Sequence, residues 1–417
     1  MSNSLIGRLI RNKIIQNTGY LSVIEIFRLL LPFVALPYII RTVGVTNYGS
    51  IAFVQAIISY FQIYINWGLD VSAVKDVSIS RDNRKELNRI VTSVLSIKFV
   101  HLLISASILC VSTLFIPYVK ENSLLFLFCF LTCFTEVLFP IWFYQGIEKM
   151  QYLALIRFAS ILFYAVSVFI FIKKTDDFLY VPLLQSIGNV LGGVVSLYIL
   201  LRVERISFCR LTRKYVVQMF KDSAPFFLSR VSVVLNNSIA KTISGIFFSM
   251  NVVAAFDLAQ KITNFSLVPI SMMNQALYPN IAKSQNRSFA QKCFRINIVL
   301  SASIAIAVFI VAPYAINFFA KDDLELAVVL TRILCIWVFF GGIVVYLGSP
   351  TLIAFGYPKP FNNSILLGTA TLLLSYLIMF VTGHVEIVYF AYALCLAESI
   401  MLSYRLYYNV RYKIIQL

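Results

Sequence analysis

Long apolar stretches limit what this chain can fold into more than any other feature of its sequence. A helix needs about twenty mostly apolar residues to cross the hydrocarbon core of a bilayer, and twelve segments of that kind follow one another along the 417 residues. They are residues 19–40, 47–69, 90–116, 122–145, 152–172, 179–201, 222–248, 252–278, 294–319, 324–354, 361–382 and 386–409. The sequence therefore predicts an all-α polytopic membrane protein with twelve transmembrane helices.

Composition excludes several other classes of protein. Sixty per cent of the residues are hydrophobic and 13% are charged, about half the charged share of an ordinary soluble domain. A soluble multidomain enzyme and a disordered chain are both excluded. The net charge of +17 would suggest nucleic acid in a soluble protein. Here basic loops against anionic lipid headgroups explain it better, so we expect membrane lipids as partners and no nucleic acid.

The basic residues beside the predicted spans and at their ends alternate from one side of the membrane to the other. Twenty-three Lys and Arg fall on one side and five on the other. The richer side holds the N-terminus, the 75–89, 202–221 and 283–295 loops, and a C-terminal group of Arg405, Arg411 and Lys413. Short cytoplasmic loops carry an excess of Lys and Arg. The sequence therefore predicts a multi-pass protein with both termini in the cytoplasm.

The longest basic loop divides the predicted spans into two sets of six. It separates an N-terminal lobe, residues 1–201, from a C-terminal lobe, residues 222–417, with 202–221 as the cytoplasmic loop between them. A shift of 205 residues aligns YGSIAFVQAI (48–57) with VAAFDLAQKI (253–262). This match is either an internal repeat or a chance similarity between two apolar helices. A repeat would relate the lobes by an axis along the membrane normal and predicts two bundles around a central cavity.

Basic residues inside the predicted spans are the candidate substrate-binding groups. An ionised side chain at the bilayer centre costs about 2.5–3.5 kcal/mol, so such residues need a reason to be there. The candidates are Arg28, Arg230, Lys241, Lys261, Arg332 and Lys98. Guanidinium and ammonium groups bind phosphate oxygens, and the predicted cargo is therefore anionic. Lys98 and Arg157 have the alternative of extending to the headgroups along their helices.

Acidic residues in or beside the spans suggest a second role. Candidates for binding a coupling H⁺ or Na⁺ are Glu25, Asp70, Asp257 and Glu398. Two of them have another explanation, because Glu25 with Arg28 and Asp257 with Lys261 are spaced to pair along one helix. His101 could join a proton relay, although we expect it to be packed among its neighbours. We predict no metal site and no cofactor.

Catalytic motifs are absent from the sequence. It contains no GxSxG, HExxH, Walker loop or Gly-rich dinucleotide fingerprint, and only two histidines, which leaves little for acid–base chemistry. Without a nucleotide-binding fold, the energy for transport would come from an ion gradient or from the gradient of the cargo. We therefore expect a transporter rather than an enzyme.

Three segments carry a resemblance to a known family. LPYIIRTVGVTNYGSIAFVQAIISYFQIYINWGLDVSAVKD (36–76) has a Pro, an Arg, a Gly, a Tyr-Gly pair and a Gly-Leu pair in order. FPIWFYQGIEKMQYLALIRF (139–158) contains Pro-x-Trp-x-x-Gln-Gly-x-Glu-Lys, and LIAFGYPKPFNNS (352–364) resembles a late cytoplasmic turn. With these segments the sequence resembles Wzx-type O-antigen and polysaccharide flippases of the multidrug/oligosaccharidyl-lipid/polysaccharide (MOP) exporter superfamily.

This resemblance implies a cargo and a location. It implies twelve helices in two lobes that open alternately to either side of the bacterial inner membrane. The implied cargo is an undecaprenyl-pyrophosphate-linked oligosaccharide, flipped to the periplasmic leaflet, and candidate protein partners are a polysaccharide polymerase and a chain-length regulator. Two alternatives stay open. One is a multidrug or organic-cation antiporter of the same superfamily, and the other is a polysaccharide-modifying membrane enzyme.

Overall fold

The computed structural model describes residues 31, 33–320 and 325–416, and these are helices joined by short connections. In the first half of the chain a helix at Phe33–Val43 precedes α3. The labelled helices are α3 (Val45–Asn66), α4 (Leu69–Ile79), α5 (Arg84–Phe115), α6 (Pro117–Glu121), α7 (Ser123–Phe130), α8 (Phe134–Leu138), α9 (Ile141–Gly146), α10 (Met150–Phe171) and α11 (Tyr180–Tyr198).

The second half of the chain continues with the remaining helices. They are α12 (Arg213–Phe247), α13 (Met250–Ser266), α14 (Val268–Ser284), α15 (Arg287–Ala320), α16 (Glu325–Tyr346), the π-helix η4 (Leu347–Ile353), α17 (Pro358–Thr382) and α18 (Ile387–Arg411). Both η4 and its neighbour α16 belong to one predicted span, at 324–354. Pro350 lies inside η4, and a proline cannot donate the backbone hydrogen bond that a regular helix needs at its position.

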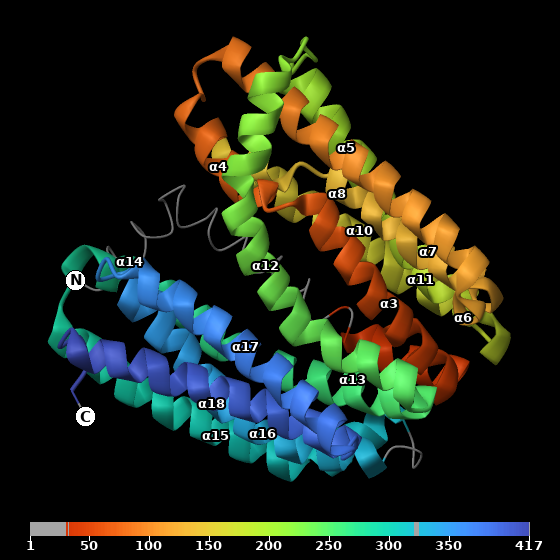
Figure 1. Ribbon diagram of the computed structural model, residues 1–417, viewed down its shortest axis with the longest axis vertical. Helices are drawn as coiled ribbons and strands as arrows, with labels where there is room; N and C mark the ends of the chain where they lie inside the picture. The colour runs from red at the N-terminus through yellow and green to blue at the C-terminus, as the bar shows by residue number, and fades with distance from the viewer. Residues whose placement is uncertain (1–30, 32, 321–324, 417) are drawn as a thin grey trace, which may run out of the picture. The chain divides into compact units, whose positions relative to one another are not determined.

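The helices form two compact units. One contains the described residues up to Gly44 together with Ile57–Arg230, and the other contains Val45–Ala56 together with the residues from Val231 onward. Helices α3 and α12 therefore each contribute to both units. In the second unit α16 lies between α15 and α18, and α17 runs along α18 (Figure 1). In the first unit α10 runs along α11 (Figure 1).

The structure confirms a helical, multi-pass membrane protein. Among the described residues, nine helical segments are long and apolar enough to cross a bilayer, and each coincides with a predicted span. The three other predicted spans are 19–40, which lies mostly outside the described residues, 222–248 in α12, and 252–278. Charged residues lower the hydropathy of α12, and the last segment is divided into α13 and α14, of 17 residues each. The count of twelve stays a prediction.

Helix boundaries repeat along the chain with the shift that the sequence suggested. Helices α3 and α13 begin 205 residues apart, at Val45 and Met250. Helices α4 and α14 end 205 residues apart, and α5 and α15 begin 203 residues apart, at Arg84 and Arg287. A divided helix followed by a long one therefore occurs twice at nearly the same spacing. This agreement from the start of α3 to the start of α5 favours an internal repeat over a chance similarity of two apolar segments.

The second family motif is part of the core of the first unit. Trp142 and Tyr144 are fully buried in the cluster that α4, α5 and α9 share. The Tyr144 hydroxyl donates a hydrogen bond to the carbonyl of Ser196, 2.5 Å away. A Cβ atom at Gly146 would overlap the side chain of Val77 in α4, so only glycine allows α9 to approach α4 this closely. The motif therefore positions helices.

Candidate functional site

The second unit holds a buried carboxylate shared by two lysines. Asp257 on α13 is 3% exposed. Its Oδ1 lies 3.0 Å from the Nζ of Lys241 on α12, and its Oδ2 lies 2.8 Å from the Nζ of Lys261, one turn further along α13. The Tyr48 hydroxyl donates to the same Oδ2 at 2.5 Å, and the Lys261 Nζ donates to the Tyr48 oxygen at 2.8 Å. We call these four residues the Asp257 cluster.

The first family motif positions this cluster. Tyr48 and Gly49 stand in the first turns of α3, which lies against α13 in the same unit. A Cβ at Gly49 would overlap the carbonyl of Met250, so glycine is needed for the close approach of the two helix starts. Thr46 on α3 also donates a hydrogen bond to the Asn251 side chain on α13, at 2.7 Å. The Tyr-Gly pair thus brings the Tyr48 hydroxyl to the carboxylate.

The Asp257 cluster keeps a net charge of +1. Asp257 and Lys261 do pair along α13, as the alternative explanation expected, but Lys241 adds a second ammonium that this carboxylate does not balance. The Lys241 and Lys261 side chains are 17% and 39% exposed, whereas the carboxylate is buried. Each ammonium has three donors. The arrangement therefore offers free N–H groups and excess positive charge to an anion.

Lys98 lies in a separate charge cluster in the first unit. It is 1% exposed on α5, and its Nζ lies 2.5 Å from Asp70 Oδ1 on α4 and 3.0 Å from the carbonyl of Glu136 on α8. Asn66 donates to both carboxylates, at 2.6 Å to Asp70 and 3.0 Å to Glu136. Two carboxylates around one lysine leave no excess positive charge. Lys98 therefore neither reaches the headgroups nor contributes to a cationic site in this arrangement.

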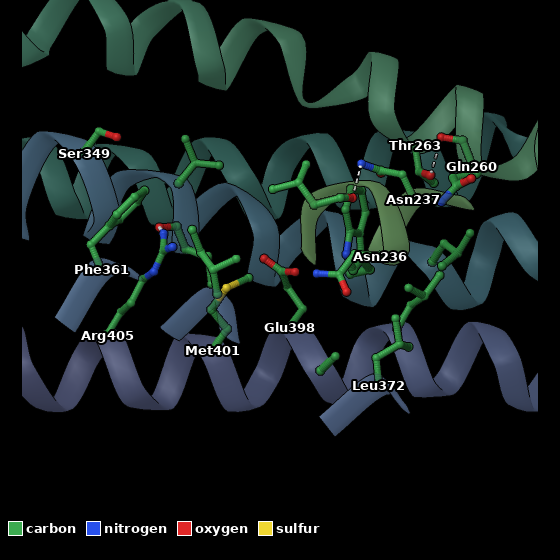
Figure 2. A pocket seen from close by; sticks show the side chains of 18 residues that line it. Asn236, Asn237, Gln260, Thr263, Ser349, Phe361, Leu372, Glu398, Met401 and Arg405 are labelled. Carbon is green, nitrogen blue, oxygen red and sulfur yellow. Dashed lines mark hydrogen bonds between the residues drawn. The ribbon is translucent and has the colours of Figure 1, made fainter. Parts of the chain in front are cut away.

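Glu398 on α18 borders a cavity of about 340 Å³ within the second unit. Figure 2 shows its carboxylate and the Asn236 side chain of α12 pointing toward one another across this cavity. Trp337 lines the same cavity. The Asn236 Oδ1 atom is buried and has no hydrogen-bond partner within the described residues. The cavity is mostly apolar, so a cation or a proton at Glu398 would meet little competition from water.

Arg405 is the charged neighbour of Glu398 in this cavity. The charge count along the sequence places Arg405 with the cytoplasmic C-terminal group, but its side chain is 4% exposed and lies inside the unit. The guanidinium donates to the Val344 carbonyl at 2.6 Å and to the Ser364 hydroxyl at 2.8 Å, and it lies over the Phe361 ring (Figure 2). The sequence did not reveal that Arg405 is buried, because near the end of a helix the sequence does not show which face packs against other helices.

A second cavity stands at the equivalent place in the first unit. It measures about 290 Å³ and is bordered by Glu136 and Arg157. Three of its lining residues precede lining residues of the Glu398 cavity by 205 positions: Phe139 and Val344, Ser160 and Ile365, Asn189 and Leu394. In each cavity an arginine lies over a phenylalanine ring, at 5.6 Å for Arg157 and 4.6 Å for Arg405.

Glu136 and Arg157 are therefore functional candidates that the sequence analysis did not select. The signal that could have found them is the 205-residue shift. It pairs Glu136 with Gly341, and a Cβ at Gly341 would lie 3.7 Å from the Glu398 carboxylate. Glu136 on α8 corresponds in sequence to Gly341 on α16, and in the second unit the carboxylate next to that position comes from Glu398 on α18. The two cavities thus have a carboxyl group at a corresponding place, but on different helices.

The remaining predicted residues lie apart from these clusters. Arg28 and Glu25 lie outside the described residues. Arg230 is exposed on α12, and Arg332 is exposed on α16 with its guanidinium 5.1 Å from the centroid of the Phe309 ring. His101 is stacked on Tyr64, with its Nδ1 3.1 Å from the Tyr64 carbonyl, which is the packed role that we expected. Of the residues selected from the sequence, Lys241, Lys261 and Asp257 therefore lie in contact with one another, and Lys98 pairs with Asp70.

Long apolar helices that enclose ion pairs and cavities define a multi-pass membrane protein, and its fold matches known transporters. The lipid II flippase MurJ in an inward closed conformation superposes with a TM-score of 0.77 at 14% identity, over 94% of this chain and 87% of that one. An inward-facing multidrug resistance MATE family transporter of the MOP superfamily gives a TM-score of 0.71 at 14% identity, over 93% and 97%. At these identities the likeness shows the fold.

The chain belongs to the polysaccharide biosynthesis protein family, whose model matches residues 14–285. This confirms the resemblance on which the sequence analysis relied. A protein of Escherichia coli (strain K12) described as "Putative O-antigen transporter" is 26% identical over 269 residues, 64% of this chain and 65% of that protein. The protein of the same description from Shigella dysenteriae is 24% identical over 63% of this chain and 66% of its own length. The matched stretch thus spans just under two thirds of each relative.

Proposed function

We propose that this chain moves an undecaprenyl-pyrophosphate-linked oligosaccharide across the bacterial inner membrane. Transport would proceed by alternating access of two six-helix lobes, residues 1–201 and 222–417, joined by the 202–221 loop, with both termini in the cytoplasm. The family, the transporters among its relatives and the fold that it shares with a lipid II flippase support this function. The observation in the structure that carries the proposal is the net positive charge of the Asp257 cluster.

Electrostatics explains how the Asp257 cluster would recognise the cargo. A unit charge 4 Å from an opposite charge gains about 4 kcal/mol at an effective dielectric constant of 20, and the two ammonium groups offset part of the cost of removing water from a diphosphate. Asp257 holds the two ammonium groups together before the ligand arrives, so less entropy is lost when the ligand binds. Lys261, the more exposed lysine, would make the first contact.

A complementation experiment tests this function. The gene is deleted in the source bacterium, variants are returned to it, and surface polysaccharide is measured on glycan-stained gels. We expect the Lys241→Gln, Lys261→Gln double variant to lose display. Lys283→Gln, which removes an exposed lysine of α14 in the same unit, should keep it and serves as the matched control. Arg230→Ala and Arg332→Ala extend the test to the other described candidates. Full display with both cluster lysines replaced would end the anion-site proposal.

Glu398 is our proposed site for a coupling H⁺ or Na⁺. Asp70 and Asp257 each contact a lysine, which competes with an added cation. The Glu398 carboxylate faces a cavity and the amide of Asn236 (Figure 2). Arg405 lines the same cavity, but among the described residues no ion pair within 4 Å joins it to Glu398. Glu398→Gln should remove the dependence of display on the transmembrane ion gradient, measured with a protonophore and with sodium-free medium. Unchanged gradient dependence in this variant would exclude Glu398 as the coupling group.

An organic-cation antiporter is the second candidate function, and the Glu398 cavity favours it. A carboxylate in a mostly apolar cavity suits a cationic ligand, and a MATE family transporter has the same fold. Efflux of a cationic dye from cells that express the chain discriminates the two functions. Coupled efflux that is lost in Glu398→Gln, without any effect on polysaccharide display, would replace the flippase proposal.

A further inference from the structure

The second unit contains another cavity, and its lining differs from that of the Glu398 cavity and from that of the cavity bordered by Glu136. It measures about 440 Å³ and lies between α14 and the α16–η4 segment. Ser271, Asn274, Gln275 and Tyr278 line it from one face of α14, at the i, i+3, i+4 and i+7 positions of a helix. Ser349 lines it from η4 and also borders the Glu398 cavity. None of its lining residues carries a formal charge.

Asn274 is a buried amide in the wall of this cavity, and one of its polar atoms has no partner within the described residues. It is 3% exposed, and its Oδ1 accepts a hydrogen bond from the Asn297 amide at 3.2 Å. Ser301 in turn donates toward Asn297 at 3.5 Å, so a buried chain of polar groups orients the Asn274 side chain. Its Nδ2 atom is buried and has no hydrogen-bond partner within the described residues. A donor left in this state costs about 1–3 kcal/mol. A turn of the amide toward the cavity would let a ligand that accepts its hydrogen bond recover this free energy.

The chemistry of the lining restricts the ligand. A phosphate would find no cation in this cavity, and a hydrocarbon chain would leave the amides and hydroxyls without partners. A neutral sugar ring offers hydroxyl groups to amide and hydroxyl side chains. It also offers a C–H face that can pack on the apolar part of the wall, which Val345, Pro350 and Ile353 supply. The cavity volume lies in the usual range for small-molecule sites, about 300–1,000 Å³.

We propose that this cavity binds a neutral pyranose residue of the cargo glycan, with Asn274 as the hydrogen-bond donor that recognises it. The inference rests on the proposed function and deepens it. Two chemically distinct parts of the cargo then bind at different places in the second unit. The Asp257 cluster takes the anionic group, and the cavity lined by Asn274 takes a sugar.

Ligand-binding measurements on the purified, full-length protein in detergent test the proposal. The sugar probes are glucose, galactose, N-acetylglucosamine and rhamnose, detected by saturation-transfer NMR, and the anion probe is inorganic pyrophosphate, detected by calorimetry. We expect at least one sugar to bind. Its affinity should fall about tenfold in Asn274→Leu and in Gln275→Leu, a change of about 1.4 kcal/mol. Gln275 is exposed, so this second variant should fold even if the first does not.

Two controls separate this proposal from the function on which it rests. Asn363→Leu, an exposed asparagine of α17, should leave sugar binding unchanged. Pyrophosphate binding should persist in Asn274→Leu and disappear in the Lys241→Gln, Lys261→Gln variant, which should still bind the sugar. Absence of sugar binding to the wild-type protein, or equal binding by wild type and both cavity variants, would overturn the sugar site. Loss of the anion site alone would overturn only the proposed role of the Asp257 cluster.

Discussion

Replacing Asp257 by asparagine should separate the stability of the Asp257 cluster from its affinity for anions. The carboxylate that both lysines share is lost, while the shape of the side chain is kept. Lys241 and Lys261 then stand close together with no opposite charge between them. Removing one partner of a buried ion pair typically costs about 3–5 kcal/mol. For a unit of 150–250 residues each kcal/mol moves the unfolding midpoint by about 2–4 °C, so we expect a fall of roughly 10 °C.

Lys261→Gln should have the opposite effects: a small change in stability and a large loss of affinity for pyrophosphate. The Lys261 side chain is 39% exposed, so solvent screens its pairing, and an exposed pair contributes about 0–1 kcal/mol. The unfolding midpoint should therefore change by less than about 4 °C. The ammonium is a charged donor to the ligand, however, and a hydrogen bond to a charged group is worth about 1.5–3 kcal/mol. Pyrophosphate affinity should fall about 10- to 150-fold.

Two measurements on the purified variants check this reasoning. Scanning fluorimetry in detergent gives the unfolding midpoint, and calorimetry at low salt gives the affinity for pyrophosphate. The folded fraction of Asp257→Asn should bind pyrophosphate at least as well as the wild type, because both ammonium groups remain. Lys283→Gln should match the wild type in both assays. The reasoning is refuted if Asp257→Asn leaves the midpoint unchanged and weakens pyrophosphate binding as much as Lys261→Gln does.

Three further predictions concern the folded frame around these sites. Trp142→Ala empties a fully buried position and should cost about 3–5 kcal/mol, seen as a lower unfolding midpoint, whereas an unchanged midpoint would contradict the packing role of its motif. Ile414→Asp places a charge where 2% of the side chain is exposed, in the core that the C-terminal residues share with α15 and α16. It should lower the midpoint by several degrees, while Gln416→Ala should not. Arg81 hydrogen-bonds Glu148 and holds the pKa of that carboxyl below its usual 4.5. Amide protection around Glu148 should therefore persist from neutral pH down to about 4.5 and be lost as pH falls further, and Glu148→Gln should remove this dependence.

The position of the helices could be predicted from the sequence. The span expected at 386–409 is α18, Ile387–Arg411, and the span expected at 90–116 is the apolar part of α5, Arg84–Phe115. Hydropathy is sufficient here because lipid leaves the backbone no partner except the helix itself. In the sequence the internal repeat is visible only as a match of ten residues. The helix boundaries in the structure support it, because they recur with the same spacing.

The partners of the buried charges could not be predicted in the same way. Lys98 and Asp70 are 28 residues apart on different helices, and Lys241 and Asp257 are 16 residues apart across a turn. Which side chains meet depends on how each helix is rotated about its axis, and an apolar helix can rotate with little change in hydropathy. Arg332 and Lys241 both lie inside predicted spans, but one is exposed beside Phe309 and the other contacts Asp257.

The sequence by itself determined a multi-pass helical membrane protein and its family, because these follow from the length, spacing and motifs of segments that each act locally. The tertiary structure alone decided that two lysines share the Asp257 carboxylate, that Arg405 is buried beside Glu398, and that Asn274 keeps an unpaired donor. The physical reason is that the net charge of a cluster and the pairing of a buried donor depend on neighbouring side chains from several helices. The sequence of one segment does not show which neighbours it will have.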